Sequence, residues 1–382
     1  MTNKYISDRE TTVADFTAGI EGCIANSASY SRSLSDKTTW SSYMGSGLLG
    51  RTMPVSVGGE GLPMSLLVAT LDGLAYGGGD ASVLFAMAAQ ILSVQHLILS
   101  FGTEEQKRTF LPPMVRGEMR AAHAATEPEA GSDIFGLQTT ARRCNGGYRL
   151  SGAKRYITNA PIADTALVLA VTDPARKNWG LSSFMVDLNS SGVSRSKNIP
   201  KMGLESAQFG EILLEDCFVA TDCRLGEEGS GSSIFSAALD LERAFIMAPA
   251  VGLMRRELDL SVAHVNTRTQ RGRTIGSFQS VSNRIADMVL RLELSKLTIY
   301  HVAALRDAGR SIRCHSPLTK LALSEFYLAS SLDAARNKGA TSYLLGDSSG
   351  TNVRDAIGSL FYSGTSDILR NLIAIYAGVH NV

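Results

Sequence analysis

The spacing of hydrophobic and polar positions changes twice along the chain. Up to residue 118, apolar residues recur every three to four positions, as in 66–99, and three glycines at 77–79 interrupt the repeat. This spacing is typical of helices, and the glycines predict a turn between two of them. Between residues 119 and 228, apolar residues occur in short or alternating runs bounded by turn residues, which predicts strands. The strand candidates are 165–171, 182–186 and 211–219.

The helical spacing returns at residue 229 and continues to the end of the chain. Five apolar residues show it at intervals of three, four and seven: Val281, Ile285, Met288, Leu292 and Ile299. The pattern therefore predicts an α+β fold of three domains. These are an N-terminal helical domain (1–118), a middle β domain (119–228) and a C-terminal helical domain (229–382).

Composition and net charge narrow the class of protein. With 382 residues, of which 44% are apolar, the chain is long enough for two or three domains with buried cores. The 37 Lys and Arg nearly balance the 36 Asp and Glu, which argues against nucleic acid as a partner. The five cysteines lack metal-ligand spacing, so we expect a reducing compartment and no metal site. Neither a secretory leader nor an apolar run of membrane-spanning length is evident, so we expect a soluble, cytoplasmic protein without a membrane partner.

The near-zero net charge conceals an uneven distribution. Residues 243–313 hold twelve basic and five acidic side chains, a local balance of +7. Because the last 69 residues hold five of each, this leaves −6 for residues 1–242. One interpretation of the basic stretch is a solvated helical face. The other is a docking surface for an acidic partner or for phosphate groups.

Two segments of the predicted β domain offer hydroxyls and backbone amides in turns. The first reads Ala-Ala-Thr-Glu-Pro-Glu-Ala-Gly-Ser-Asp at 124–133, and the second reads Lys-Arg-Tyr-Ile-Thr-Asn-Ala at 154–160. Pro128 fixes a bend, Gly131 permits close approach of another group to the backbone, and Ser132 and Thr158 can donate hydrogen bonds. Each segment alone would be an ordinary loop.

Together these segments resemble the flavin-contacting signature of the acyl-CoA dehydrogenase family, TEPxAGSD followed by an aromatic-Ile-Thr-Asn segment. The resemblance covers nearly the whole chain, including Phe278-Gln279, Arg354-Asp355 and the closing Gly-Thr-Ser-Asp-Ile at 364–368. It implies the acyl-CoA dehydrogenase fold, with a helical N-terminal domain, a middle β-barrel domain and a C-terminal four-helix bundle. It also implies FAD as cofactor and a homo-oligomer, usually a tetramer.

The resemblance also implies which residues contact the cofactor. Ala125, Thr126 and Ser132 are expected to line the flavin and its phosphates, and Tyr156 and Thr158 to lie against its ring. Also expected at the cofactor are His123, Gly131, Thr365 and Asp367. Those expected at the FAD of a neighbouring subunit are Arg268, Phe278, Gln279, Arg336 and Gly339. Arg336 and Gly339 belong to a stretch that departs from the family's Gln-x-x-Gly-Gly.

The position of the catalytic base departs from the commonest family pattern. Members of the family that this chain resembles most often place the catalytic glutamate directly before the Gly-Thr of the closing motif, where this chain has Ser363. A minority, such as isovaleryl-CoA dehydrogenase, place it within an LDLER segment, which this chain has at 239–243. The resemblance therefore implies Glu242 as the base, with Arg243, Ser363 and Gly364 beside the substrate.

The helical pattern supports Glu242 independently. Steps of three and four place it on one face with Phe235, Leu239, Ile246 and Pro249, where it is the only ionisable group. A carboxylate among apolar neighbours loses solvation, which raises its pKa toward the value that a general base needs. The alternative is an acidic residue near a helix start that is stabilised by the helix dipole or by an ion pair.

Within the family, the chain resembles in particular the dehydrogenases that act on L-prolyl groups carried by peptidyl carrier proteins. This resemblance implies oxidation of an aminoacyl thioester on phosphopantetheine, leading to a pyrrolyl thioester in antibiotic or other secondary metabolism. Glu205 and Phe209 replace an arginine and a threonine of a loop near CoA, which disfavours free CoA. Since carrier proteins are acidic, the basic stretch predicts a docking face with Arg255, Arg256, Arg271 and Arg273.

Three other functions stay open at this point. One is a short branched-chain acyl-CoA dehydrogenase that uses the same glutamate. Another is a flavin monooxygenase or oxidase on the same fold. The third is a flavin-binding relative without catalytic activity.

Overall fold

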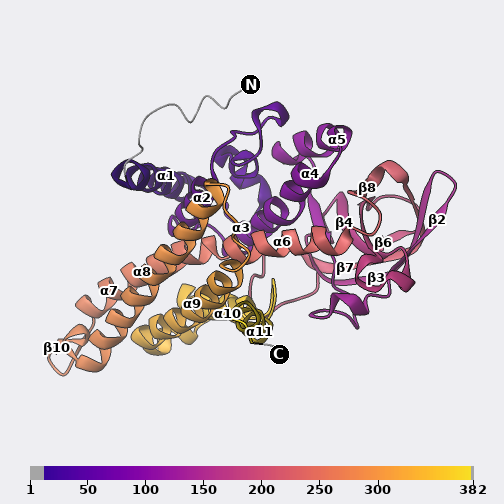
Figure 1. The fold of residues 1–382 in the computed structure, drawn as a ribbon. Helices are drawn as coiled ribbons and strands as arrows, with labels where there is room; N and C mark the ends of the chain where they lie inside the picture. Colours follow the sequence, from indigo (N-terminus) through magenta and orange to yellow (C-terminus); the bar gives the residue numbers. More distant parts are fainter. Residues whose placement is uncertain (1–12, 380–382) are drawn as a thin grey trace.

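The computed structural model describes residues 13–379, and its N-terminal part is helical, as predicted (Figure 1). Helix α2 ends at Tyr76, and the glycine run 77–79 separates it from α3. The side chain of Asp80 begins α3 by accepting hydrogen bonds from the amides of Ser82 and Val83. The α-helices of this part are α1 (Val13–Ser33), α2 (Met64–Tyr76), α3 (Ala81–Gln90), α4 (His96–Phe101) and α5 (Glu104–Val115), with short turns η1 (Trp40–Ser46), η2 (Leu48–Gly50) and η3 (Val55–Val57).

Helices α3 and α4 form one continuous run through a π-helical segment, η4 (Ile91–Gln95). This run, Ala81–Phe101, is long and apolar enough to cross a membrane, contrary to the expectation that no such run exists. Within the structure, however, 83% of its most apolar 18-residue window is buried, as in the core helix of a globular protein.

The middle part is an eight-stranded sheet, and the strand candidates of the sequence correspond to β4, β5 and β7. The hydrogen-bonded order is β6-β7-β3-β2-β4-β5-β8, with β1 pairing in parallel with β4. No β6–β8 pair closes this path among residues 13–379, so the expected barrel is open. The strands are β1 (Ala121–Ala124), β2 (Thr140–Cys144), β3 (Gly147–Thr158), β4 (Thr165–Val171), β5 (Leu181–Asp187), β6 (Val193–Arg195), β7 (Phe209–Ala220) and β8 (Arg224–Leu225).

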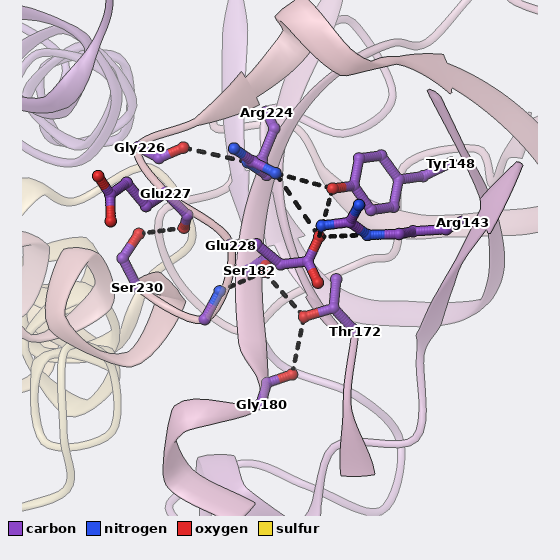
Figure 2. Close-up of polar contacts among 11 residues, drawn as sticks. Arg143, Tyr148, Thr172, Gly180, Ser182, Arg224, Gly226, Glu227, Glu228 and Ser230 are labelled. Atoms are coloured by element: carbon purple, nitrogen blue, oxygen red, sulfur yellow. Dashed lines mark hydrogen bonds and ion pairs between the residues drawn. The ribbon is translucent and has the colours of Figure 1, made fainter. Parts of the chain in front are cut away.

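A polar cluster fixes the loop that leads from the sheet into the C-terminal helices (Figure 2). The carboxylate of Glu228 accepts hydrogen bonds from Tyr148 and Arg143. The amide of Gly229 donates to Ser182 at 2.9 Å, and Arg224 donates to the Tyr148 hydroxyl at 2.8 Å. The cluster therefore holds the start of the next helix, α6, against the sheet.

The C-terminal part consists of long helices, as predicted, and begins with α6. Ile234 and Ala238 of α6 share a buried cluster with Leu167 and Met185 of the sheet, whereas Leu241 and Phe245 lie in the main helical core. Helix α6 thus joins the two parts (Figure 1). The helices are α6 (Gly231–Phe245), α7 (Ala248–Thr267), α8 (Gln279–Asp307), α9 (Ser316–Lys338), α10 (Ser348–Ser359) and α11 (Ser366–Tyr376), and a hairpin of β9 (Thr269–Gln270) and β10 (Arg273–Thr274) joins α7 to α8.

Helix α7 packs closely on α2, which changes the interpretation of two arginines. A Cβ at Gly252 would lie 2.1 Å from the carbonyl oxygen of Asp72, so only glycine permits this approach. Beside it, Arg255 is ion-paired at 3.0 Å with the fully buried carboxylate of Asp72, and Arg256 donates to the Tyr76 carbonyl at 3.3 Å. Both arginines thus contact α2, and only Arg255 has its charge paired there, so their part in a docking face stays a prediction. The charge balance of a segment cannot show that a helix directs its charges inward.

Candidate functional site

A cavity of about 640 Å³ lies where the sheet meets the two helical parts. Its walls come from α3, the sheet, the 201–209 loop, α6 and the segment between α10 and α11. Eleven of the residues predicted to contact FAD or the substrate line it: His123, Ala125, Thr126, Gly131, Ser132, Tyr156, Thr158, Arg243, Ser363, Gly364 and Thr365. Glu242 lines it as well. The fold therefore brings motifs that are far apart in the sequence together around one cavity.

Glu242 is the only acidic side chain among the described residues that line this cavity. It lies on α6 together with Phe235, Leu239 and Arg243, which also line the cavity. Burial raises the pKa of Glu242 above its ordinary value. Hydrogen bonds from Ser93 and Ser363 and the charge of Arg243 lower the pKa, but by less than burial raises it. A buried carboxylate with a raised pKa in a cavity suits proton abstraction.

Two serine hydroxyls contact the carboxylate of Glu242, one at each oxygen. Ser93, from the π-helical segment η4, donates to Oε1. Ser363 donates to Oε2 at 3.0 Å. Arg243 holds the turn at Ser363, because its Nε donates a hydrogen bond to the Ser363 carbonyl at 3.1 Å. Ser363 therefore reaches the base itself, a contact that the sequence did not suggest when it placed this residue beside the substrate.

The wall formed by β3 owes its shape to a bulge. The register of β3 against β7 shifts between Lys154 and Ile157, and Tyr156 has a φ of 62°. This left-handed conformation is costly for an aromatic residue, and such strain is concentrated at functional sites. It leaves the Tyr156 ring 52% exposed and stacked on Phe209, with ring centroids 5.9 Å apart.

The loop at 125–132 is supported by a buried ion pair. The ammonium of Lys154 lies 2.8 Å from a carboxylate oxygen of Glu127 and also donates to the Ala125 carbonyl at 3.0 Å. Glu127 in turn accepts the amides of Gln138 and Thr139. Both ionic residues stand in the quoted sequence segments, but only the fold shows that they face each other beneath the loop.

The cavity fits a flavin nucleotide by the chemistry of its walls. The hydroxyls of Thr126, Ser132 and Thr158 have no protein partner among residues 13–379, and all three residues line the cavity. A Cβ placed on Gly131 would meet no atom within 4 Å, so this turn has room for a ligand. Burial, with a smaller effect of Lys154, lowers the pKa of His123 to about 4, which keeps that imidazole neutral. Hydroxyls without a protein partner and accessible backbone amides are suited to hydrogen bonds with the phosphates and the ring of a flavin nucleotide.

Six of the predicted cofactor contacts do not line this cavity. Asp367 carries a side chain that is 94% exposed and 3.8 Å from Arg370. The other five are those predicted for a neighbouring subunit: Arg268, Phe278, Gln279, Arg336 and Gly339. A hydrogen bond of 2.9 Å between Arg284 of α8 and Asn337 of α9 places these five at one end of the bundle. This is the end that carries the β9–β10 hairpin, away from the sheet (Figure 1).

Three family models match the chain in the order of its parts. They are the N-terminal domain of acyl-CoA dehydrogenase at 13–118, its middle domain at 122–217 and its C-terminal domain at 229–376. With the three-part fold and a buried glutamate in the cavity, the chain belongs to the acyl-CoA dehydrogenase family.

Among its relatives, an L-prolyl-[peptidyl-carrier protein] dehydrogenase from Pseudomonas fluorescens is 39% identical over 329 residues, 86% of this chain and 87% of that protein. The crystal structure of the prolyl acyl carrier protein oxidase AnaB superposes with a TM-score of 0.92 at 37% identity, covering 95% of this chain and 99% of AnaB. The structure of PigA with FAD and proline gives a TM-score of 0.91 at 30% identity, covering 98% of this chain and all of PigA.

Proposed function

We propose that the protein is an FAD-dependent dehydrogenase that oxidises an L-prolyl thioester on a peptidyl carrier protein to a pyrrolyl thioester. The observation that carries this proposal is that Glu242, the one carboxylate among the described residues of the cavity lining, shares the cavity with the hydroxyls of Thr126, Ser132 and Thr158. The named substrates of its relatives, a prolyl carrier protein and proline, supply the substrate class.

The residues of the chain divide the chemistry as follows. Glu242 takes the proton from Cα of the thioester, so that the C–H bond breaks and an O–H bond forms on the carboxyl. When bound, FAD supplies the acceptor for the hydride that leaves the neighbouring carbon. The hydroxyls of Thr126, Ser132 and Thr158 would hold the cofactor, and Tyr156 would lie against its ring. Arg243 fixes the Ser363 turn beside the base.

The charges around Arg354 in the cavity lining favour a carrier protein over free CoA as the form of the substrate. Arg354 lines the cavity, but its guanidinium is ion-paired with Glu205 at 2.7 Å. An arginine that is already neutralised offers little attraction to the phosphates of a nucleotide. Phosphopantetheine on a carrier protein brings no adenosine phosphates to this point.

We further propose that the enzyme is a homotetramer in the cytoplasm. The five predicted contacts at the far end of the bundle cannot serve the cavity of their own chain, so a second chain must receive them if they bind FAD. The outer face of α8 supports contact between chains, since Leu290 and Leu297 are 57% and 67% exposed. All five cysteines are free, as a reducing compartment requires.

The proposal is tested by anaerobic mixing of the FAD-loaded enzyme with prolyl carrier protein. We expect bleaching of the flavin and, with an electron acceptor present, loss of four hydrogen atoms from the carrier-bound group by mass spectrometry. Isovaleryl-CoA should bleach the flavin far more slowly. Faster bleaching by isovaleryl-CoA would instead identify a branched-chain acyl-CoA dehydrogenase.

A first variant tests the base. Glu242→Gln should lower the rate of flavin bleaching at least ~100-fold, because the amide cannot accept the proton, and FAD should stay bound. Glu257→Gln is the matched control, since Glu257 is also a buried glutamate but lies outside the cavity. Undiminished bleaching by Glu242→Gln would contradict the role of Glu242.

A further inference from the structure

The carboxylate of Glu242 accepts a hydrogen bond at each of its oxygens, one from Ser93 and one from Ser363. An ionised carboxylate can only accept, so both the Ser93 and the Ser363 hydroxyl donate to Glu242. Each carboxylate oxygen has two lone pairs, so one on each remains for the substrate. The two donors come from segments 270 residues apart in the chain, and each is held in place by its own surroundings.

Ser93 owes its direction to the π-helical segment. A π turn takes in one residue more than an α turn, and so it changes which side chain of the run faces α6. Ser93 is fully buried at this contact. Single π turns inside helices occur frequently at functional sites, because they redirect side chains at a cost in helix stability.

Ser363 owes its direction to a turn held in an unfavourable conformation. Its φ is 54°, in the left-handed region that favours glycine. The turn persists because the carbonyls of Ser363 and Gly364 accept hydrogen bonds from Arg243 at 3.1 Å and from Lys320 at 2.9 Å. Lys320 is buried and also donates to the Ser359 carbonyl at the end of α10. Backbone strain that the surrounding structure maintains in this way is concentrated at functional sites, which supports a role for the Ser363 side chain.

We infer that Ser93 and Ser363 are positioning residues for Glu242, whose hydroxyls hold its carboxylate in the orientation from which it takes the Cα proton. The inference rests on the proposed function, which makes Glu242 the base. The two donors have a second effect. Both hydrogen bonds favour the ionised carboxylate, so they lower the pKa of Glu242 against the rise that burial causes.

The test uses the FAD-loaded enzyme and the pH dependence of flavin bleaching by prolyl carrier protein. Removing a donor from Glu242 raises its pKa, so the acidic limb of the rate profile should move upward by about one pH unit in Ser93→Ala and in Ser363→Ala. The double variant should move further. Ser295→Ala is the matched control, because Ser295 is buried in α8 and its hydroxyl donates to the Arg291 carbonyl of its own helix.

A second variant at the turn separates the hydroxyl from the backbone. Ser363→Gly removes the same hydroxyl but relieves the left-handed φ. If the hydroxyl matters, the Gly and Ala variants shift the limb equally. If only the backbone matters, the Gly variant retains the wild-type profile, which would overturn the assignment of Ser363. The Gly variant also provides the test if Ser93→Ala does not fold.

Infrared titration of the carboxyl band makes the test independent of turnover. The band of Glu242, identified by its loss in Glu242→Gln, should titrate at higher pH in both serine variants. If prolyl carrier protein does not bleach the wild-type flavin, the proposed substrate is wrong, and this titration still tests the two serines. If wild-type bleaching is normal and both alanine variants titrate like the wild type, the positioning role is wrong.

Discussion

Lys154 and Glu127 form a buried ion pair beneath the 125–132 loop, in which FAD contacts are predicted. Their side chains are 0% and 4% exposed, and Lys154 also donates a hydrogen bond to the Ala125 carbonyl of the 125–132 loop. We predict that Lys154→Met destabilises the protein by about 3 kcal/mol, because it leaves the Glu127 charge buried without its partner. It should also weaken FAD binding, since the loop loses a support. Urea unfolding and flavin fluorescence measure the two effects.

Two comparisons make this prediction specific. Adding Glu127→Gln to Lys154→Met should recover part of the stability, because no charge is then left buried. Arg142→Met, which breaks the exposed pair with Asp216, should change little. Equal losses of stability from Lys154→Met and Arg142→Met would show that burial does not determine how much an ion pair contributes to stability.

The sequence predicts some site residues and not others for physical reasons. Glu242 is predictable because the 3.6-residue period places it alone on an apolar face, and the structure puts it in the cavity. Ser93 is not, because its contact depends on a π turn that leaves no mark in the pattern of apolar residues. The ion pair of Arg255 is not predictable from a charge count either, since its partner Asp72 lies on a helix almost two hundred positions earlier.

At the scale of elements, the crossing of α7, α9 and α10 buries a carboxyl group that the mechanism does not use. Glu257 of α7 accepts a hydrogen bond from Ser331 of α9 at 2.9 Å. Burial raises its pKa from 4.5 to about 7, while Asn352, Ser331 and Lys338 oppose this and Asp355 adds to it. The folded protein thus binds this proton more tightly than the unfolded chain. The stability from Glu257 is full below pH 4.5 and is lost as the pH rises through 7.

We therefore predict that the effect of Glu257→Gln on stability grows as the pH rises. At pH 5 the variant and the wild type should unfold at similar urea concentrations, because both side chains are neutral. At pH 8 the variant should be the more stable by about 2–3 kcal/mol, since it has no charge to bury. A difference in unfolding free energy that is the same at both pH values would contradict the raised pKa of Glu257.

Element boundaries follow from the sequence more readily than element pairings do. The candidate 165–171 coincides with β4, and 182–186 and 211–219 lie within β5 and β7, because alternation is a local property. The parallel pairing of β1 with β4 is not local, since it joins Ala121 to Thr165 although β2 and β3 lie between them in the sequence. The sequence therefore predicts the three parts of the chain, whereas their common cavity depends on contacts between distant segments.

At the scale of the whole molecule, the predicted FAD contacts lie in two separate groups, so under the proposed assembly we expect each complete site to use two chains. One chain gives the cavity with Glu242, and another gives the bundle end with Arg268. In a two-fold pair of chains, each site then combines Glu242 of one with Arg268 of the other. Arg268→Glu should weaken FAD binding and lower activity, although Arg268 does not line the cavity of its own chain.

This arrangement predicts that two inactive variants restore each other. When Glu242→Gln and Arg268→Glu chains are co-expressed, a mixed pair has one site with both residues intact and one with neither. Random pairing makes half of the pairs mixed, so about a quarter of wild-type activity should return. Co-purification through two affinity tags enriches the mixed pairs and should raise the fraction to about one half. If Arg268 served the cavity of its own chain, every mixed pair would hold two damaged sites, and co-expression would restore nothing.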